Sequence, residues 1–240
     1  LMLNTLKNAW KEAIEKELKI FQPEKLKEIE NDIININPDM IVVVSYGKFL
    51  PKSILKIPKY GCINVHPSLL PKYRGSAPIQ WAIINGDKIT GTTIMEMNEK
   101  MDAGDIILQE QVEIQADETT GELWSRLSKI SSELLLKAVM QIENGTANYI
   151  KQSENYTLAP MLTKDMAKIN WEKYDSNSLK NLIRGLNPIL GAYCNLGQKK
   201  IKLWKIDVLQ EEFDNNIEPG TVIMSDSKKG LYVKTKDGAI

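Results

Sequence analysis

A continuous run of apolar residues at positions 40–44, most of them β-branched, constrains the fold more than any other stretch of this sequence. Such an unbroken run suits a strand that is covered on both faces, as in a parallel sheet. A second short strand is predicted at residues 62–66, and residues 53–57 between the two have room for a short helix. Strand, helix and strand in this order predict an α/β fold with a doubly wound, mostly parallel sheet.

The side chains of the second predicted strand alternate between two faces. Residues two apart in a strand point to the same side, so Cys62, Asn64 and His66 share one face, and Ile63 and Val65 share the other. We expect the isoleucine and the valine to face the core. The amide and the imidazole would then face outward at the C-terminal end of the strand, where open α/β sheets place their ligands.

His66 is the only histidine among the 240 residues, so it is the sole candidate for proton chemistry near neutral pH by an unperturbed side chain. A lone histidine is often structural, and the loop after it could be an ordinary loop with a hydrophobic plug. Asn64 on the same face favours a catalytic role, because an amide donor beside an imidazole can stabilise a developing oxyanion. These residues alone leave both interpretations open.

Residues 64–75 read NVHPSLLPKYRG, and residues 101–105 downstream read MDAGD. Together they resemble the formyltransferase family that uses 10-formyltetrahydrofolate. Residues 75–80 (GSAPIQ) and 85–91 (NGDKITG) resemble one branch of this family, the branch that acts on methionyl-tRNA. The similarity extends over nearly the whole chain. Its most specific part is the combined spacing of Asn64, His66 and Asp102.

The resemblance implies a Rossmann-like catalytic domain in which Asn64, His66 and Asp102 are the catalytic residues. Without the resemblance, Asp102 in its turn-rich loop would be interpreted as a turn former or a solvated acid. The folate would lie against two short segments near the Asp102 loop. The implied cofactor-binding residues are Ser68, Leu69, Leu70, Pro71, Lys48, Phe49 and Leu50.

The implied reaction transfers the formyl group of 10-formyltetrahydrofolate to the α-amino group of methionine on initiator tRNA, for translation initiation. No metal is expected, and covalent catalysis by Ser68 is not indicated. Sugar-nucleotide formyltransferases, formyl-folate hydrolases and glycinamide ribonucleotide formyltransferases share the three catalytic residues. The β-rich tail argues against the last group, and residues 76–79 favour the tRNA branch. A non-catalytic RNA-binding protein is a different alternative, which the intact catalytic residues oppose.

The charge balance limits the possible partners. With 31 basic and 31 acidic residues, the chain is not a strongly basic nucleic-acid coat protein, although a local basic patch is compatible with this balance. Lysines are dense after residue 198, where they form either a solvated surface or a face that follows tRNA phosphates. These lysines are Lys199, Lys200, Lys202, Lys205, Lys228, Lys229, Lys234 and Lys236.

The two cysteines, Cys62 and Cys194, are sparse and far apart, which indicates a reducing cytosol rather than a disulfide framework. One histidine and two cysteines also argue against a structural zinc site. No run of about 18 apolar residues is present, so no membrane span is expected. We therefore expect a cytoplasmic enzyme, and we expect it to be a monomer.

Three domains are predicted: residues 1–170 as the catalytic domain, 171–195 as a helical linker, and 196–240 as an incomplete C-terminal domain. By resemblance, the first strand of the sheet and the loop after it would precede residue 1. After residue 198, short strands separated by Gly and Asp indicate a small β-barrel that resembles the oligonucleotide-binding (OB) type. Helices are predicted at about residues 5–18, at 178–186, and from a capping box at Thr119 and Glu122 to about residue 144.

Overall fold

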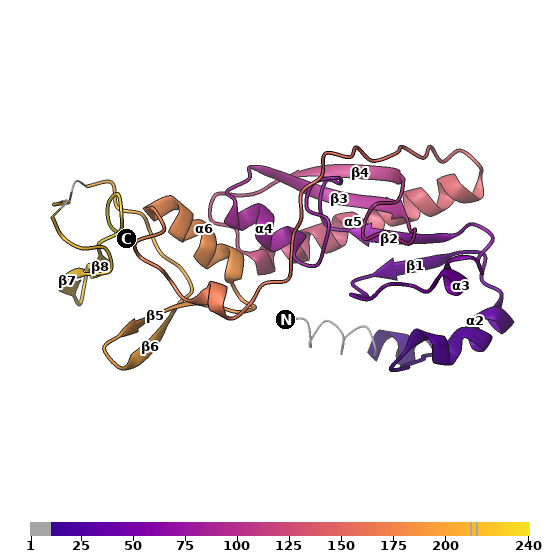
Figure 1. Cartoon of the computed structure of the whole chain (residues 1–240), viewed down its shortest axis with the longest axis horizontal. Helices are drawn as coiled ribbons and strands as arrows, with labels where there is room; N and C mark the ends of the chain where they lie inside the picture. The colour runs from indigo at the N-terminus through magenta and orange to yellow at the C-terminus, as the bar shows by residue number, and fades with distance from the viewer. Residues whose placement is uncertain (1–10, 212, 215) are drawn as a thin grey trace. The chain divides into compact units, whose positions relative to one another are not determined.

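The computed structural model describes residues 11–211, 213–214 and 216–240 (Figure 1). The helix predicted at about residues 5–18 begins outside the described residues, and residues 11–15 are helical. The chain forms two compact units. Unit 1 comprises Leu1–Ser76, Gly91–Val112 and Arg126–Ala159, and unit 2 comprises Ala77–Thr90, Glu113–Ser125 and Pro160–Ile240.

A four-stranded sheet is the centre of unit 1. Its strands are β1 (Ile41–Val44), β2 (Cys62–His66), β3 (Ile89–Glu96) and β4 (Ile106–Glu113), hydrogen-bonded in that order. Strands β1 and β2 are parallel, and the short helix α3 (Lys52–Leu55) connects them. The predicted strand–helix–strand unit is confirmed.

The expectation of a mostly parallel sheet is wrong for the next pair, because β2 and β3 are antiparallel, with His66 opposite Thr93. The helix between them, α4 (Pro78–Ile84), has seven residues and is about 10 Å long. Strand β3 has eight residues and extends about 26 Å. Because the pair is antiparallel, the chain enters β3 at the end of the sheet where it leaves β2.

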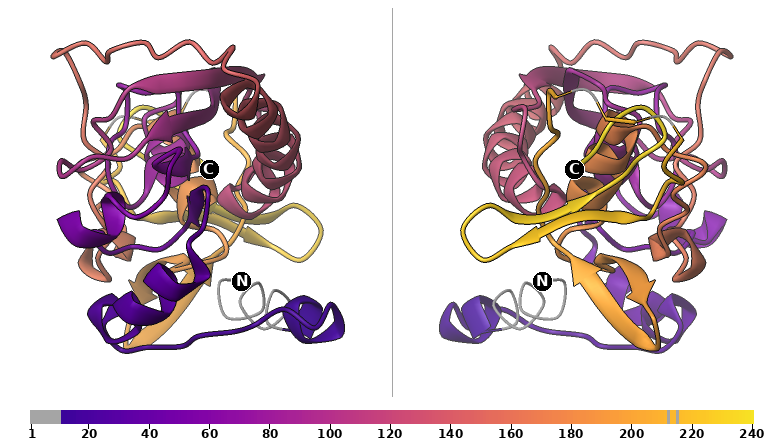
Figure 2. Two further views of the ribbon diagram at one scale, coloured as in Figure 1. Left: turned by 90° about the vertical axis from the view of Figure 1, so that its right-hand side faces the viewer. Right: turned by 90° about the vertical axis from the view of Figure 1, so that its left-hand side faces the viewer.

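Helices cover both faces of this sheet, as in a doubly wound fold. On one face, α5 (Thr120–Glu143) contributes Leu134, Ala138 and Ile142 to a cluster that includes Ile63 and Val65 of β2. Figure 2 shows this long helix beside the strands. On the other face, Cys62 packs in a cluster with residues of α3, of the 3-10 helix η1 (Leu26–Ile29) and of α2 (Glu30–Ile36).

The two faces of β2 therefore differ less than the alternation predicts. Ile63 and Val65 face the core as expected, but His66 is also buried, with 4% of its surface exposed. The expectation of an imidazole that faces outward is wrong. The loop after β2 folds back over this end of the strand and hydrogen-bonds to the imidazole.

Unit 2 is organised around helix α6 (Ser176–Leu186), which packs against α4. The Asp175 side chain caps α6 by accepting a hydrogen bond from the Ser178 backbone N–H at 2.7 Å. A methyl group at Gly185 would come within 2.5 Å of Ile84 Cγ1, so glycine permits the close approach of the two helices. The core of the unit includes Leu179, Leu182, Ile183 and Leu186.

The C-terminal part of unit 2 is rich in short strands. After the 3-10 helix η2 (Asp165–Ala167) and α6, strands β5 (Ala192–Leu196) and β6 (Lys199–Leu203) form one hairpin. Strands β7 (Val222–Asp226) and β8 (Gly230–Val233) form another. The described residues thus contain two two-stranded sheets here, drawn in orange and yellow in Figure 2. No helix in the described part of the chain is both long and apolar enough to cross a bilayer.

Candidate active site

The imidazole of His66 lies at the end of β2 between a backbone carbonyl and a carboxylate. Its Nε2 is 2.8 Å from the carbonyl oxygen of Tyr73, and its Nδ1 is 3.7 Å from Oδ2 of Asp102. Because a carbonyl oxygen can only accept a hydrogen bond, Nε2 must carry a proton. In the neutral imidazole, Nδ1 is then the unprotonated nitrogen, and it faces the Asp102 side.

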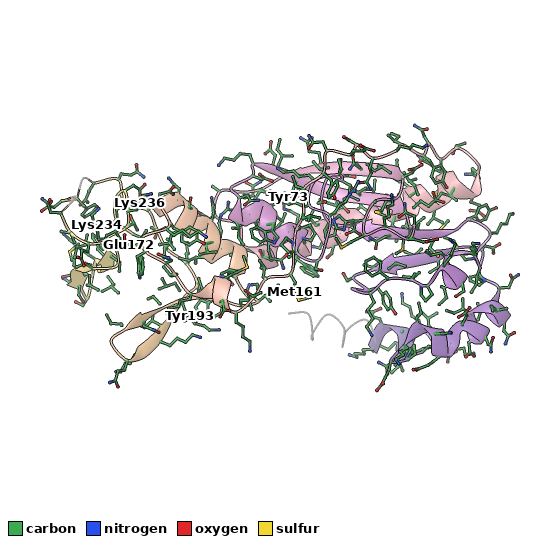
Figure 3. The ribbon with its side chains drawn as sticks, in the orientation of Figure 1. Tyr73, Met161, Glu172, Tyr193, Lys234 and Lys236 are labelled. Atoms are coloured by element: carbon green, nitrogen blue, oxygen red, sulfur yellow. The ribbon has the colours of Figure 1, made fainter. Side chains whose placement is uncertain are left out.

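The loop that supplies the Tyr73 carbonyl is held by its own hydrogen bonds and by β3. Ser68 Oγ donates to the Lys72 carbonyl at 2.6 Å, and Thr93 Oγ1 donates to the Ser68 carbonyl at 2.6 Å. Tyr73, labelled in Figure 3, has a left-handed backbone with φ of 64°. This conformation is uncommon for a residue with a side chain, and the surrounding bonds maintain it.

Asp102 lies in the loop between β3 and β4, also with a left-handed backbone at φ of 48°. Its Oδ2 accepts a hydrogen bond from the backbone N–H of Gly75 at 2.8 Å. Gly104 brings the same loop against the end of β3, where an added Cβ would come within 1.8 Å of the Glu96 carbonyl oxygen. Glycine at position 104 therefore permits the close approach of this loop to β3.

Burial lowers the pKa of His66 from its ordinary value, and this effect outweighs two opposing ones. The negative charge of Asp102 and the hydrogen bond to the Tyr73 carbonyl both raise the pKa, since both favour the protonated ring. The imidazole is therefore neutral near pH 7, with Nε2 protonated. It can accept a proton at Nδ1, where Asp102 stabilises the resulting charge.

Asn64 is on the same strand as His66, two residues before it. In the sheet it lies between Val43 of β1 and Met95 of β3. Its side chain is half-buried. The structure brings all three predicted catalytic residues to one region, since Asn64 and His66 share a strand face and Asp102 reaches His66 from a loop.

The predicted folate-binding residues have different surroundings. Ser68 and Leu70 are buried, and Leu70 packs with Met95 and Ile106. Leu50 is buried as well, in the cluster that contains Cys62. Their side chains support the loops. The more exposed members of the predicted set are Phe49, at 68% exposure, Lys48, Leu69 and Pro71.

Four residues of this region were not predicted as site residues: Tyr73, Arg74, Gly75 and Gln152. The first three lie within the recognised stretch, but no sequence signal shows that the Tyr73 carbonyl and the Gly75 N–H face the catalytic side chains. Gln152 lies far along the chain in an irregular polar segment. Nothing in its local sequence distinguishes it, and only its contacts identify it.

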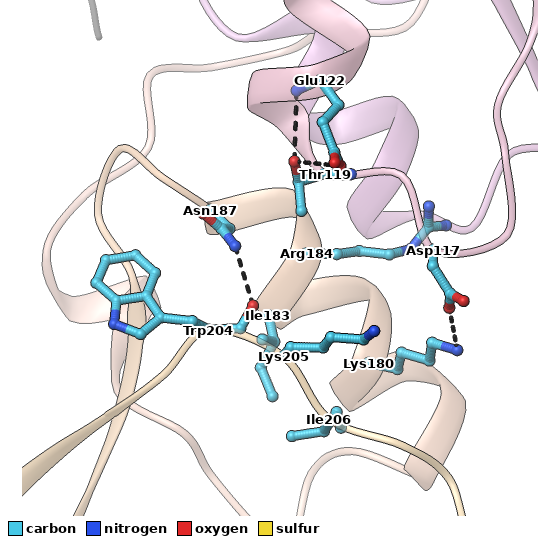
Figure 4. A pocket seen from close by; sticks show the side chains of 10 residues that line it. All are labelled: Asp117, Thr119, Glu122, Lys180, Ile183, Arg184, Asn187, Trp204, Lys205 and Ile206. Carbon is cyan, nitrogen blue, oxygen red and sulfur yellow. Dashed lines mark hydrogen bonds and ion pairs between the residues drawn. The ribbon is translucent and has the colours of Figure 1, made fainter.

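Unit 2 contains a separate cavity of about 230 Å³ with a mixed charged and apolar lining (Figure 4). Asp117 and Lys180 form an ion pair in its wall at 2.5 Å. Arg184 is buried and donates to the carbonyls of Gln115 and Glu118. None of the predicted catalytic or folate-binding residues lines this cavity, whose lining residues are Asp117, Thr119, Glu122, Lys180, Ile183, Arg184, Asn187, Trp204, Lys205 and Ile206.

The lysines after residue 198 have more than one environment. Lys205 lines the cavity, whereas Lys234 is buried at 2% exposure and donates to the Thr235 carbonyl at 3.0 Å. Lys234 and Lys236 are labelled in Figure 3. The prediction that all eight lysines lie on a solvated or phosphate-binding surface is therefore wrong for Lys234. Within the described part of the chain, no group of three or more His, Cys, Asp or Glu side chains is arranged to hold a metal ion.

Comparison with known families defines the class of protein. Residues 5–139 match the family described as formyl transferase, and residues 161–240 match the formyl transferase C-terminal domain. The first match alone covers more than half of the chain. The chain belongs to the formyltransferase family.

Curated relatives narrow this class to one branch. The chain is 44% identical over 226 residues to the methionyl-tRNA formyltransferase of Malacoplasma penetrans, covering 94% of this chain and 70% of the relative. It is 45% identical over 231 residues to the enzyme of the same name from Agathobacter rectalis, covering 95% of this chain and 73% of the relative.

Solved structures with the same fold include more distant members. A 4-N formyltransferase from Francisella tularensis is 26% identical, with a TM-score of 0.71, covering 86% of this chain and 85% of that one. HypX from Aquifex aeolicus, solved in complex with tetrahydrofolic acid, is 21% identical with a TM-score of 0.70. This second match covers 95% of the present chain and 39% of HypX, and at this identity it supports the fold alone.

Proposed function

We propose that this chain transfers the formyl group of 10-formyltetrahydrofolate to the α-amino group of methionine on initiator tRNA, giving formyl-methionyl-tRNA for translation initiation. One observation carries the proposal: a buried imidazole, that of His66, is held by the Tyr73 carbonyl at Nε2, with its other nitrogen toward Asp102. The names of the relatives, at 44–45% identity, support formyl transfer to methionyl-tRNA.

The catalytic residues have distinct roles in this proposal. When the amine attacks the formyl carbon, the formyl oxygen becomes an oxyanion, and the amide N–H of Asn64 stabilises it. Nδ1 of His66 takes the proton that the amine loses. The imidazolium then donates a charge-assisted hydrogen bond to the oxyanion and can return the proton to the leaving nitrogen. The charge of Asp102 stabilises the imidazolium, and the hydrogen bond from Nε2 to the Tyr73 carbonyl keeps the ring oriented.

The surroundings of the site suit a flat heterocycle that carries the formyl group. Phe49, Leu69 and Pro71 supply apolar surface that is at least partly exposed, and Lys48 and neighbouring backbone groups supply polar contacts. Ser68, Leu70 and Leu50 support these segments from within. HypX, which shares the fold, is solved in complex with tetrahydrofolic acid, so the fold is compatible with a folate co-substrate.

The domain limits of 1–170, 171–195 and 196–240 are part of the proposal, as is a cytoplasmic monomer that needs no metal. The pairing of the β5–β6 and β7–β8 hairpins into a closed, OB-like barrel stays a prediction. A surface of the C-terminal domain that binds tRNA phosphates also stays a prediction, and the buried Lys234 is not part of it.

The test uses the full-length protein with methionyl initiator tRNA and 10-formyltetrahydrofolate, comparing the wild type with His66→Ala. Formylated methionyl-tRNA from the wild type, lost in the variant, is the expected result. Formate release without labelling of the tRNA would assign a hydrolase instead. Formylation of an amino-sugar nucleotide but not of the tRNA would assign the sugar branch. Absence of folate chemistry in the wild type would contradict the proposal.

A further inference from the structure

One amide side chain, Gln152, connects the two loops that surround His66. Its Nε2 donates to the carbonyl oxygens of Asp102 at 2.9 Å and of Gly104 at 2.7 Å. Its Oε1 accepts from Nε of Arg74 at 3.0 Å and from Nη2 at 2.7 Å. Both N–H groups and the oxygen of the amide are thus engaged. Among side chains of this length, only a glutamine both donates two hydrogen bonds and accepts two.

Arg74 is the right partner for such a connection because of its neighbours in the chain. Tyr73 on one side supplies the carbonyl that binds His66 Nε2, and Gly75 on the other supplies the N–H that binds Asp102. Arg74 itself is buried, with its guanidinium 4.4 Å from the ring centre of Tyr156. A displacement of Arg74 would therefore move both backbone groups that hold the catalytic pair.

The segment that carries Gln152 is fixed to the same loop further along. The backbone N–H of Arg74 donates to the Thr157 carbonyl at 2.9 Å, and the Ala159 N–H donates to the Arg74 carbonyl at 2.7 Å. Tyr73 N–H also donates to Thr157 Oγ1 at 2.9 Å. The segment that carries Gln152 is therefore already paired with the loop that contains Arg74. The Gln152 side chain extends from this segment to the loop that contains Asp102.

The two loops need this support because their backbones are strained. Asp102 and Tyr73 both have positive φ values, which the surrounding structure must maintain. The contact between His66 and Asp102 is already long at 3.7 Å, so a small shift of the Asp102 loop would weaken it further. From these contacts we infer that Gln152, held by Arg74, is a positioning residue that sets the distance between His66 and Asp102 for formyl transfer. This inference rests on the proposed function.

Three variants separate positioning from general stability. Gln152→Met keeps the length of the side chain and removes every hydrogen bond. Gln152→Glu keeps the bonds to Arg74 and adds an ion pair, but it places a carboxylate oxygen against the carbonyls of Asp102 and Gly104. Thr120→Val is the matched control, because Thr120 is buried and donates to the Gly185 carbonyl at 2.7 Å within unit 2, whereas the predicted catalytic residues belong to unit 1.

The readouts are kcat and KM for methionyl-tRNA and folate, the pH profile of kcat and the melting temperature. We expect both Gln152 variants to lower kcat by about 10- to 100-fold with little change in either KM, since misplacement by about 1 Å costs on that order. The Glu variant should melt closer to the wild type than the Met variant and still have low kcat. In Gln152→Met, which adds no charge, the His66 limb of the pH profile should move to lower pH, because the Asp102 charge raises that pKa in the wild type.

Wild-type kcat in the Gln152→Glu variant would overturn the inference. So would a loss of activity that follows the melting temperature equally in the Gln152 variants and in Thr120→Val. If Gln152→Met does not fold, Gln152→Asn replaces it, since its shorter amide withdraws the donors from the Asp102 loop. A wild type that does not formylate methionyl-tRNA would contradict the proposed function, whereas fully active variants of a working enzyme contradict only this inference.

Discussion

The carboxylates of Asp102 and Asp117 each face a basic side chain, but in opposite surroundings. Asp102 is 3.7 Å from His66 Nδ1, and the two side chains are 18% and 5% exposed. Asp117 is 2.5 Å from Lys180 Nζ, and those side chains are 62% and 26% exposed. Water screens the shorter pair, whereas the longer one acts through a medium of low polarity. Burial, rather than separation, is therefore expected to decide which pair affects function.

The same contrast appears in the pKa values. Lys180 lowers the pKa of Asp117 by a hydrogen bond and by its charge, as for a solvated ion pair. For His66, burial lowers the pKa even though Asp102 opposes it. The ion pair of Asp117 and Lys180 stabilises two charges that water alone would also solvate. The pair of His66 and Asp102 keeps a neutral base beside a carboxylate, which is an arrangement suited to proton transfer.

The largest effect is expected where the buried region performs chemistry. Asn64→Ala should reduce formylation by about 10²- to 10³-fold, because it removes an oxyanion donor. Steady-state kinetics with methionyl-tRNA measure this, and Asn195→Ala, which removes an exposed asparagine of β5, is the control. Activity above one tenth of the wild type in Asn64→Ala would exclude the amide from the reaction.

A second way to test the buried region is to displace its loop. In Gly104→Ala the new methyl group would come within 1.8 Å of the Glu96 carbonyl, so the Asp102 loop must move away from β3. We expect kcat to fall by about tenfold or more. Gly145→Ala is the control, since it meets nothing within 4 Å and only adds backbone strain at φ of 69°. Equal activity in the two variants would show that the position of the loop is unimportant.

The lowered pKa of His66 predicts a smaller effect, on stability rather than on rate. The folded protein binds this proton less readily than the unfolded chain does. The contribution of the neutral His66 to the free energy of unfolding is therefore fully present above the unfolded pKa of about 6.5. This contribution is lost as the pH falls toward the folded pKa. His66→Gln does not titrate, so urea unfolding of both proteins between pH 8 and pH 5 should show a steeper loss in the wild type. Parallel curves would contradict the assignment.

The smallest effect is expected for the exposed pair. Asp117→Asn removes the ion pair with Lys180 at the cavity wall, and the free energy of unfolding should change little because the carboxylate is solvated. Any difference from the wild type should disappear in 0.5 M salt. Thermal melting at low and high salt measures this. A large, salt-independent loss of stability in Asp117→Asn would show that the exposed pair also contributes strongly, against the contrast with the buried pair of His66 and Asp102.

Several features of this protein follow from local sequence. The alternation of residues 62–66 places Ile63 and Val65 in the core, because successive side chains of a strand point to opposite faces. Thr119 and Glu122 form the predicted capping box, with the Thr119 N–H donating to Glu122 at 2.8 Å. These patterns depend only on neighbours within a few residues, so they can be read without the rest of the fold.

Other features were decided only when distant segments came together. The burial of His66 and the lowering of its pKa come from the loop that folds over β2. The antiparallel pairing of β3 with β2 and the burial of Lys234 within a lysine-rich tail also appear only in the folded chain. The sequence by itself determined the β1–α3–β2 unit, the capping box of α5 and which residues could do chemistry, since these depend on residue type and spacing, whereas β5 lies in a stretch predicted as a helical linker. Tertiary structure alone decided which nitrogen of His66 is free and which distant amide holds Asp102, because those contacts join residues 7 and 50 positions apart.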